Sequence, residues 1–268
     1  MGRISQYINP EGKIEKFLRD PAGNLHVTHD RDPEAKTQTS SYKGTVYTHD
    51  INGNLVKRVT GEDETLFTWD ENNHLIRAVR NGQTTEFTYD ALGRRLKKET
   101  DGSITEFFWD GDQLMADRKN GKLREFIYYP GTFKPLAVLD DNKKIHYFNT
   151  DIAGLPREVI TQDGEVIWSA SFDINGKIET LHENLFDNPI RFQGQYHDEE
   201  LDLYYNRHRY YDPNAGAFIS KDPLGLAAGD NIYAYAPNVW GWVDPLGLSR
   251  DKCGLDNPSN NKNNTVYR

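Results

Sequence analysis

A four-residue pattern, aromatic-any-aromatic-Asp, recurs in the first half of the chain at a fixed step of 20 residues. Its copies end at Asp70, Asp90 and Asp110, and a variant with His49 in place of the second aromatic ends at Asp50. Fixed periods of about 20 to 50 residues are typical of stacked structural repeats, in which a single unit cannot fold alone. This period restricts the fold more than any other feature of the sequence.

The residues around each Asp predict a β-hairpin. Three positions after the Asp stands Gly53, Asn73 or Gly93, which are the residue types that best tolerate positive φ, and we expect positive φ at all three. Phe67 and Trp69 share one face of the preceding strand because side chains alternate with period two. One hairpin cannot bury such an aromatic row, so neighbouring hairpins must pair edge to edge. The sequence therefore predicts a long antiparallel sheet with less than about a tenth of helix.

After Asp110 the period loosens, although strands are still predicted at 126–129, 145–148 and 166–172 between turns marked by Pro or Gly. Residues 178–185 are the only helix-like stretch, and His182 and Asn184 argue against a stable helix there, so we expect a connector. The tyrosine pairs and the basic run at 204–211 are interpreted as strands that pack in a sheet, with Arg207, His208 and Arg209 on one charged face.

Composition excludes several function classes. The net charge of −9, from 32 basic and 41 acidic residues, disfavours general binding of nucleic acid. The single cysteine, Cys253, excludes an intramolecular disulfide, and no apolar run is long enough to predict a membrane span or a secretory signal. His26 and His29, and His197 beside Asp198, lack further ligands at metal-site spacing, so neither a metal nor another cofactor is predicted.

The pentapeptide Asp-Pro-Leu-Gly-Leu occurs twice near the end of the chain, at 222–226 and at 244–248. Asp initiates turns through its side chain and Pro presets φ, so each copy alone predicts only a turn. Two identical turns that frame an aromatic segment indicate something more, namely that Asp222 and Asp244 are brought to one place. Paired carboxylates can carry out acid–base chemistry, in which one draws a proton from water while the other polarises a carbonyl group.

At this point the chain resembles a known family. The aromatic–Asp repeats are similar to the YD repeats of Rhs proteins and of the C subunits of insecticidal toxin complexes. Residues 188–248 resemble the Rhs repeat-associated core domain. The motifs that carry this second likeness are RFQGQY at 191–196, LYYNRHRYYDP at 203–213, GAFI at 216–219, NIYAYA at 231–236 and GWVDPLGL at 241–248.

The resemblance implies an all-β fold. Residues 1–187 would form an antiparallel hairpin-repeat sheet that curls into a partial shell, as one segment of a YD-repeat spiral. Residues 188–248 would form an autoproteolytic core-associated plug at its C-terminal end, and 249–268 would be the start of a variable toxin region or a polar remnant. The shell would enclose a C-terminal toxin and release it by cutting the chain after the second pentapeptide.

Carried over residue by residue, the resemblance implies Asp222 and Asp244 as a catalytic aspartate pair and Leu248–Ser249 as the scissile bond. The protein would then be a single-turnover aspartyl autoprotease. Several relatives have Arg directly before the first Asp, where this chain has Lys221, a less geometrically defined donor that we consider as a helper.

The implied partners are the chain's own C-terminal toxin segment, an N-terminal shell portion, an immunity protein and a secretion apparatus. The protein would be made in the bacterial cytoplasm without its own signal peptide and delivered or secreted as an effector in interbacterial competition. Two alternatives stay open. One is a surface-associated adhesin or carbohydrate-binding repeat protein, which requires exposed aromatic rows and separated Asp-Pro turns. The other is a remnant of an Rhs locus that no longer processes itself.

Overall fold

The computed structural model describes residues 37–228, 231–235 and 242–248, and also the backbone of four short strands: β1 (Gln6–Ile8), β2 (Ile14–Lys16), β3 (Thr28–Asp32) and β24 (Asp251–Lys252). Strands β3 to β18 form one antiparallel sheet of 16 strands in chain order, which we call the shell. The all-β prediction is confirmed, because the only helix in the described residues is a 3-10 turn at Gly225–Ala228.

The strands of the shell have regular lengths. After β3 they are β4 (Thr37–Tyr42), β5 (Thr45–His49), β6 (Leu55–Thr60), β7 (Asp63–Trp69), β8 (Leu75–Arg80), β9 (Gln83–Tyr89), β10 (Arg95–Thr100), β11 (Ser103–Asp110), β12 (Gln113–Lys119), β13 (Lys122–Tyr128), β14 (Pro135–Leu139), β15 (Ile145–Thr150), β16 (Pro156–Thr161), β17 (Val166–Phe172) and β18 (Ile178–Asn184).

Asp50, Asp70 and Asp90 close their turns through main-chain amides, whereas Asp110 is the last residue of β11 and lies opposite Gln113. Oδ1 of Asp70 accepts hydrogen bonds from the amides of Asn72 at 2.9 Å and His74 at 2.8 Å. The predicted left-handed residues are confirmed, with φ of 84° at Gly53, 60° at Asn73 and 72° at Gly93. A side-chain oxygen that accepts from amides two and four residues ahead makes Asp the turn-forming residue of the repeat.

The second aromatic residue of a repeat forms a hydrogen bond with the preceding hairpin. The side chains of Trp69, Tyr89, Trp109 and Tyr128 each donate a hydrogen bond of 2.7 or 2.8 Å to a main-chain carbonyl fourteen residues earlier. That carbonyl lies at or next to the start of a preceding strand, beside a β-bulge. The position therefore needs an aromatic ring that also carries a donor, which Tyr and Trp have and Phe lacks.

The expectation of a connector at 178–185 is wrong, because these residues form β18, an edge strand of the shell. β18 pairs with β17 through two register shifts. Its side chains are mostly exposed, which explains why the hydrophobic pattern gave no strand signal there. Bulges and charged residues such as Glu179 and Glu183 are common on sheet edges, where they oppose further pairing.

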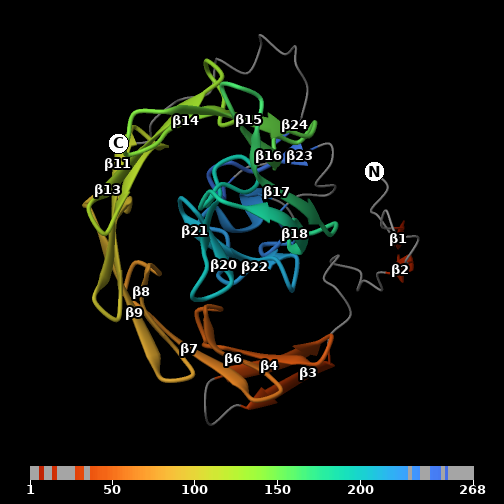
Figure 1. Cartoon of the computed structure of the whole chain (residues 1–268). Coiled ribbons are helices and arrows are strands. Elements are labelled where there is room, and N and C mark those ends of the chain that lie inside the picture. The colour runs from red at the N-terminus through yellow and green to blue at the C-terminus, as the bar shows by residue number, and fades with distance from the viewer. Residues whose placement is uncertain are drawn as a thin grey trace.

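The shell curves around the residues that follow it (Figure 1). We call the described part of 188–248 the plug. Its strands are β19 (Tyr196–Asp198), β20 (Leu203–Asn206), β21 (Arg209–Asp212) and β22 (Ala217–Phe218), which form one sheet, and β23 (Trp242–Val243), which pairs with β24. The inward aromatic row of the shell is buried against the plug in two hydrophobic clusters that include Tyr47, Phe67, Phe87, Phe107, Phe126, Leu203, Tyr204, Tyr205, Tyr210 and Tyr211.

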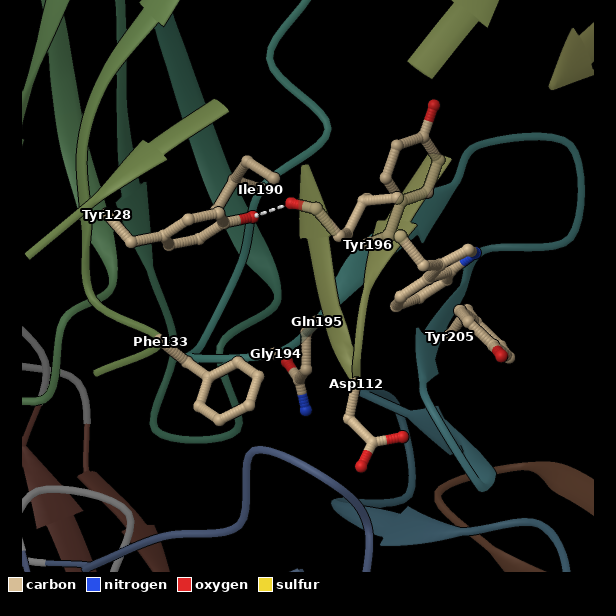
Figure 2. Close-up of a pocket in the computed structure, with 10 residues that line it drawn as sticks. Asp112, Tyr128, Phe133, Ile190, Gly194, Gln195, Tyr196 and Tyr205 are labelled. Atoms are coloured by element: carbon tan, nitrogen blue, oxygen red, sulfur yellow. Dashed lines mark hydrogen bonds between the residues drawn. The ribbon is translucent and has the colours of Figure 1, made fainter. Parts of the chain in front are cut away.

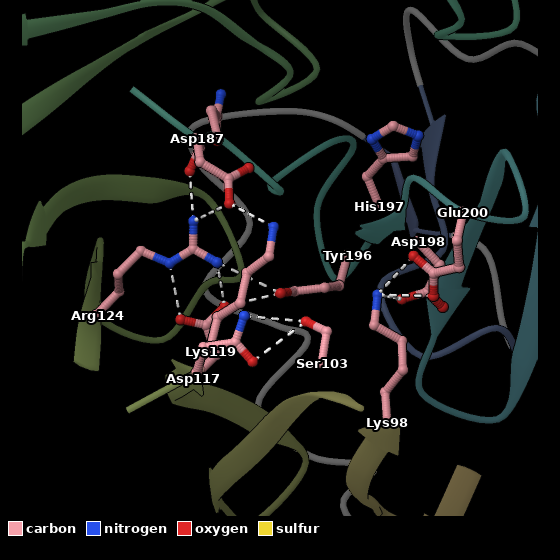
Figure 3. Close-up of polar contacts among 12 residues, drawn as sticks. Lys98, Ser103, Asp117, Lys119, Arg124, Asp187, Tyr196, His197, Asp198 and Glu200 are labelled. Carbon is pink, nitrogen blue, oxygen red and sulfur yellow. Dashed lines mark hydrogen bonds and ion pairs between the residues drawn. The ribbon is translucent and has the colours of Figure 1, made fainter. Parts of the chain in front are cut away.

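Buried ion pairs fix the plug to the inner face of the shell. Lys98 of β10 binds Asp198 of the plug at 2.9 Å, and fully buried Arg95 binds the same carboxylate at 2.5 Å. The Arg95 guanidinium also lies 4.2 Å from the ring centre of Tyr205. Figure 3 shows Lys98 reaching Asp198 and Glu200, and a second group in which Arg124, Asp117 and Tyr196 meet. These contacts determine where the plug sits within the shell.

The aromatic donor predicts a measurable stability difference. Tyr128→Phe removes only the hydroxyl that binds the Leu114 carbonyl, so we expect the free energy of unfolding to fall by about 1–2 kcal/mol. Tyr147→Phe is the matched control, since the Tyr147 ring is exposed and its hydroxyl has no hydrogen bond in the described part of the chain. Urea unfolding curves measure both, and equal midpoints would contradict this explanation of the repeat.

Asp198→Asn should destabilise the protein by about 3–5 kcal/mol, because it leaves Arg95 buried beside a neutral group. Glu200→Gln leaves Lys98 paired with Asp198 and keeps an oxygen that can accept from Nζ, so it should change the free energy of unfolding by about 1 kcal/mol or less. Unfolding in urea at neutral pH distinguishes the two variants, and equal effects would show that the buried pair is dispensable.

The same pair predicts acid sensitivity. Burial alone would raise the pKa of Asp198, but the charges of Arg95 and Lys98 outweigh it and hold that pKa below its ordinary value. The stability that Asp198 provides is therefore present above about pH 4, the range of an unfolded Asp, and is lost as the pH falls through the lower folded-state pKa. The acid-induced loss of stability should be smaller in Asp198→Asn than in the wild type.

Candidate active site

The two Asp-Pro-Leu-Gly-Leu turns are built like the Asp turns of the shell. Oδ1 of Asp222 accepts from the Leu224 amide at 2.9 Å, and Oδ1 of Asp244 accepts from the Leu248 amide at 2.9 Å. Gly225 and Gly247 have φ of 57° and 69°, as in the shell turns. One oxygen of each carboxylate is thus used by its turn, and Oδ2 is left for another partner.

That partner is Arg209, which joins the two turns. Its Nη2 lies 2.8 Å from Oδ2 of Asp222 and 3.2 Å from Oδ2 of Asp244, and all three side chains are about 1% exposed. Two oxygens that share one nitrogen are at most about 6 Å apart, the sum of the two distances. The structure therefore brings together the two aspartates that the repeated pentapeptide singled out. The guanidinium offsets their mutual repulsion.

Arg209 uses its remaining nitrogens to hold nearby main chain. Nε donates to the Gly247 carbonyl at 2.6 Å and Nη1 to the Ile232 carbonyl at 3.0 Å, while the guanidinium lies 3.7 Å from the ring centre of Phe218. A planar group with five donors can satisfy all of these partners at once, which an ammonium group cannot do.

These contacts grip the peptide unit just before the predicted scissile bond. The carbonyl of the Gly247–Leu248 peptide binds Nε of Arg209, and its N–H binds Oδ1 of Asp244. Leu248 is therefore held beside one of the two carboxylates. Ser249, the other residue of the predicted bond, lies outside the described residues.

The second turn is packed tightly against the plug. The Asn206 side chain donates to the Asp244 carbonyl at 2.7 Å, and the His208 amide donates to the Leu246 carbonyl at 3.2 Å. A Cβ on Gly247 would lie 2.8 Å from the Asn206 carbonyl oxygen, and one on Gly194 would lie 1.9 Å from the Pro245 carbonyl oxygen. Both glycines are needed because backbone approaches backbone at these two points.

Lys221, which the sequence suggested as a helper, lies elsewhere. It is exposed, and among the described residues it forms no ion pair or hydrogen bond with Asp222 or Asp244. Its side chain instead covers Gly53 of the shell. The cation at the carboxylates is Arg209. The sequence interpretation placed Arg207, His208 and Arg209 on one charged strand face, and this is wrong. Arg207 and His208 form the turn between β20 and β21, and all four residues of β21 are buried, so the charge of Arg209 needs buried anions.

A small cavity lies between shell and plug, and neither Asp222 nor Asp244 lines it. It measures about 20 Å³ and is lined by residues that include Asp112, Tyr128, Phe133 and Gln195. In Figure 2 the Gln195 side chain, which is 2% exposed, lies between Phe133 and Asp112. The space is large enough for one water-sized molecule, so it is not a site for an organic cofactor.

The described residues contain no group of three or more His, Cys, Asp or Glu side chains placed to hold a metal ion. Burial and the nearby charge of Arg191 lower the pKa of His197 to about 3, so its ring is neutral, and it accepts a hydrogen bond from Arg191. His26 lies outside the described residues. Within the part of the chain that the structure describes, no helix has the length and apolar character that spanning a membrane requires.

Comparison with known proteins assigns the family. Residues 1–235 match the family model described as Teneurin YD-shell. The chain belongs to the YD-shell family. The predicted likeness to Rhs and other YD-repeat proteins is thereby confirmed.

Three bacterial proteins share part of this YD shell. Double-stranded DNA deaminase toxin A of Burkholderia cenocepacia (strain H111) is 37% identical over 161 residues, which cover 52% of this chain and 11% of the toxin. Toxin protein Tse5 of Pseudomonas aeruginosa (strain PAO1) is 36% identical over 172 residues, covering 52% and 13%. RhsA of Dickeya dadantii (strain 3937) is 34% identical over 149 residues, covering 53% and 10%. The chain thus spans about a tenth of the length of these relatives.

Solved structures share the fold. The Tc holotoxin pore of Photorhabdus luminescens superimposes with a TM-score of 0.63 at 16% identity, over 90% of this chain and 13% of that one. The TcdB2–TccC3 protein without its hypervariable C-terminal region gives 0.56 at 15% identity, over 92% and 17%. The curved sheet around an inner plug is therefore an architecture that solved toxin subunits also have.

Arg209→Lys keeps the charge but cannot bind both carboxylates and both carbonyls together, so we expect the free energy of unfolding to fall by about 2–3 kcal/mol. Arg77→Lys on the exposed face of β8 is the matched control and should stay within about 0.5 kcal/mol of the wild type. Urea titration checks both. An Arg209→Lys variant with the same free energy of unfolding as the wild type would show that Arg209 does not hold the two turns together.

Proposed function

We propose that this YD shell encloses a C-terminal toxin segment and releases it by a single aspartyl self-cleavage after Leu248. The observation that carries the proposal is the buried pair of Asp222 and Asp244 on one Arg209 nitrogen, with the peptide before the bond gripped by the same groups. In this proposal residues 1–187 form the shell segment, 188–248 the autoproteolytic domain, and 249–268 the start of the released region.

The proposed chemistry is hydrolysis by a water molecule. The ionised carboxylate takes a proton from water as the oxygen attacks the Leu248 carbonyl carbon, while the protonated carboxylate gives its proton to the carbonyl oxygen. The resulting diol collapses, the bond to the Ser249 nitrogen breaks, and that nitrogen takes a proton. The products are a carboxyl group on Leu248 and an amino group on Ser249. We assign the acid and base roles to the pair and not to one aspartate each.

Arg209 supports this reaction by position. It keeps both carboxylates within reach of one main-chain segment and fixes the Gly247 carbonyl, so the Leu248 carbonyl has little freedom to turn away. Holding the reacting groups in place can contribute several kcal/mol to lowering a barrier. Arg209 therefore takes the part that sequence reasoning gave to Lys221.

The relatives support a role in toxin delivery. Two of them are named as toxins, and one solved relative is described as lacking a hypervariable C-terminal region. By analogy we propose that the chain acts in a secreted or delivered bacterial effector, with its own C-terminal region as cargo. The described sheet is open at β3 and β18, so complete enclosure would use further shell strands. An immunity protein and a secretion apparatus remain expected partners.

The adhesin alternative finds less support. It requires exposed aromatic rows and separated Asp-Pro turns, whereas Tyr47, Phe67, Phe87 and Phe107 are buried against the plug and Arg209 joins the two turns. The non-processing remnant differs from the proposed function only in whether the chain is cut.

Intact mass after expression tests the cut. The wild-type chain should separate into residues 1–248 and 249–268 under denaturing conditions, even if the two pieces stay associated when folded. Asp222→Asn and Asp244→Asn should each abolish the cut, because an amide is similar in size but cannot transfer the proton at neutral pH.

Asp90→Asn is the matched control for these variants. Asp90 makes the same turn contacts in the shell, with its Oδ1 binding the amides of Leu92 and Arg94, but it is not part of the aspartate pair. It should leave the cut unchanged. Cleavage that persists in either Asn variant of the pair would exclude the aspartyl mechanism, and a wild-type chain that is never cut would favour the remnant.

A further inference from the structure

The first aspartate turn is attached to the shell as well as to the plug. Within the plug, the Asp222 amide donates to the Ile232 carbonyl at 2.9 Å. The neighbouring residue Tyr233 reaches the shell, where its hydroxyl donates to the Gly53 carbonyl at 3.0 Å. Its ring also makes an edge contact with His49, at 5.9 Å between ring centres. Residues 232–233 therefore connect the main chain of Asp222 to the shell turn that contains Gly53.

Two more contacts join the same partners. The Leu55 amide of β6 donates to the Ile219 carbonyl at 2.8 Å, three residues before Asp222. A Cβ on Gly53 would lie 2.2 Å from Cε of Lys221 and 2.4 Å from the Tyr233 hydroxyl, so both side chains already rest on that glycine. The shell turn at 50–54 thus touches the plug on both sides of Asp222.

The second aspartate turn has different supports. Asn206, His208 and Gly194, which hold residues 244–247, all belong to the plug. The position of Asp222 relative to Asp244 therefore depends on where one repeat of the shell places the first turn. A misplacement of about 1 Å between reacting groups can cost about a hundred-fold in rate.

We propose that the shell turn at 50–54 is a positioning element for Asp222, acting through contacts of Gly53 with Tyr233 and Lys221. The effect on the rate of the cut rests on the proposed function, but the effect on the position of Asp222 can be tested without it. Gly53 is required for its positive φ, and a Cβ there would displace Cε of Lys221 and the hydroxyl of Tyr233, the residues through which this turn contacts the plug on both sides of Asp222. Lys221 acts by packing on this turn and not by its charge.

A matched pair of glycines isolates the contact. Gly53 and Gly102 both lie in shell turns with nearly equal φ, 84° and 82°, but a Cβ on Gly102 would have no atom within 4 Å. Gly53→Ala and Gly102→Ala therefore carry the same backbone strain, and only the first disturbs the plug. On the uncut Asp244→Asn background the two should have similar urea midpoints.

The rate of the cut and amide exchange give the two readouts. In the full chain, Gly53→Ala should slow the cut by about ten-fold or more relative to Gly102→Ala, followed by intact mass over time. Tyr233→Phe alone removes the hydroxyl that binds the Gly53 carbonyl without adding a side chain to the shell turn, so it should also slow the cut. A slower cut at an unchanged urea midpoint is the result that a loss of overall stability would not give.

Hydrogen exchange at the amides of Asp222, Leu224 and Gly225, which are bonded within or to this turn, should be faster in Gly53→Ala than in Gly102→Ala. Equal exchange and equal cleavage rates in the two variants would overturn the inference. If the wild-type chain is not cut, the proposed function fails, and the exchange comparison alone still decides whether this shell turn positions Asp222.

Discussion

The whole molecule depends on one small interaction, a carboxylate oxygen of Asp that accepts hydrogen bonds from main-chain amides two and four residues ahead. Asp70 and Asp90 close shell hairpins in this way. The aspartates of the candidate site use the same contacts, Asp222 to the second amide and Asp244 to the fourth. What distinguishes the site is the partner of the second carboxylate oxygen, Oδ2. In a shell turn Oδ2 binds a side chain of the same turn, such as Arg94 on Asp90, whereas in the plug Oδ2 of both aspartates binds Arg209. The candidate active site is thus two ordinary turns with a common cation.

Part of the positive charge of the shell is buried on its inner face. The chain is acidic overall, yet the inner face carries the buried cations Arg58, Arg95 and Lys98, which pair with carboxylates of the plug. Each of these cations would be costly to bury alone and is tolerated because the plug supplies its partner. The plug is therefore held by groups that the shell cannot leave unpaired, and its place is specified by charge as well as by aromatic packing.

Sequence reasoning predicted most of the fold, because the Asp turn and the alternating aromatics are local signals that repeat. It also selected Asp222 and Asp244 from the repeated pentapeptide. It failed at β18, whose strand state comes from pairing with β17 and not from its own pattern. It missed Arg209 because nothing local separates a buried arginine from an exposed one. Only the packing of β21 inside the shell shows that this charge has no access to water and must meet the two carboxylates.

Trp69, Tyr89, Trp109 and Tyr128 each donate a hydrogen bond to a carbonyl fourteen residues earlier, so each of their hairpins contacts the preceding hairpin in the same way. Gain or loss of twenty residues would add or remove one complete hairpin and leave equivalent contacts at the junction. Gain or loss of one residue within a strand would instead turn the aromatic row outward. The length of such a wall can therefore evolve only in whole hairpins, and the interior volume available to a cargo changes in steps of the same unit.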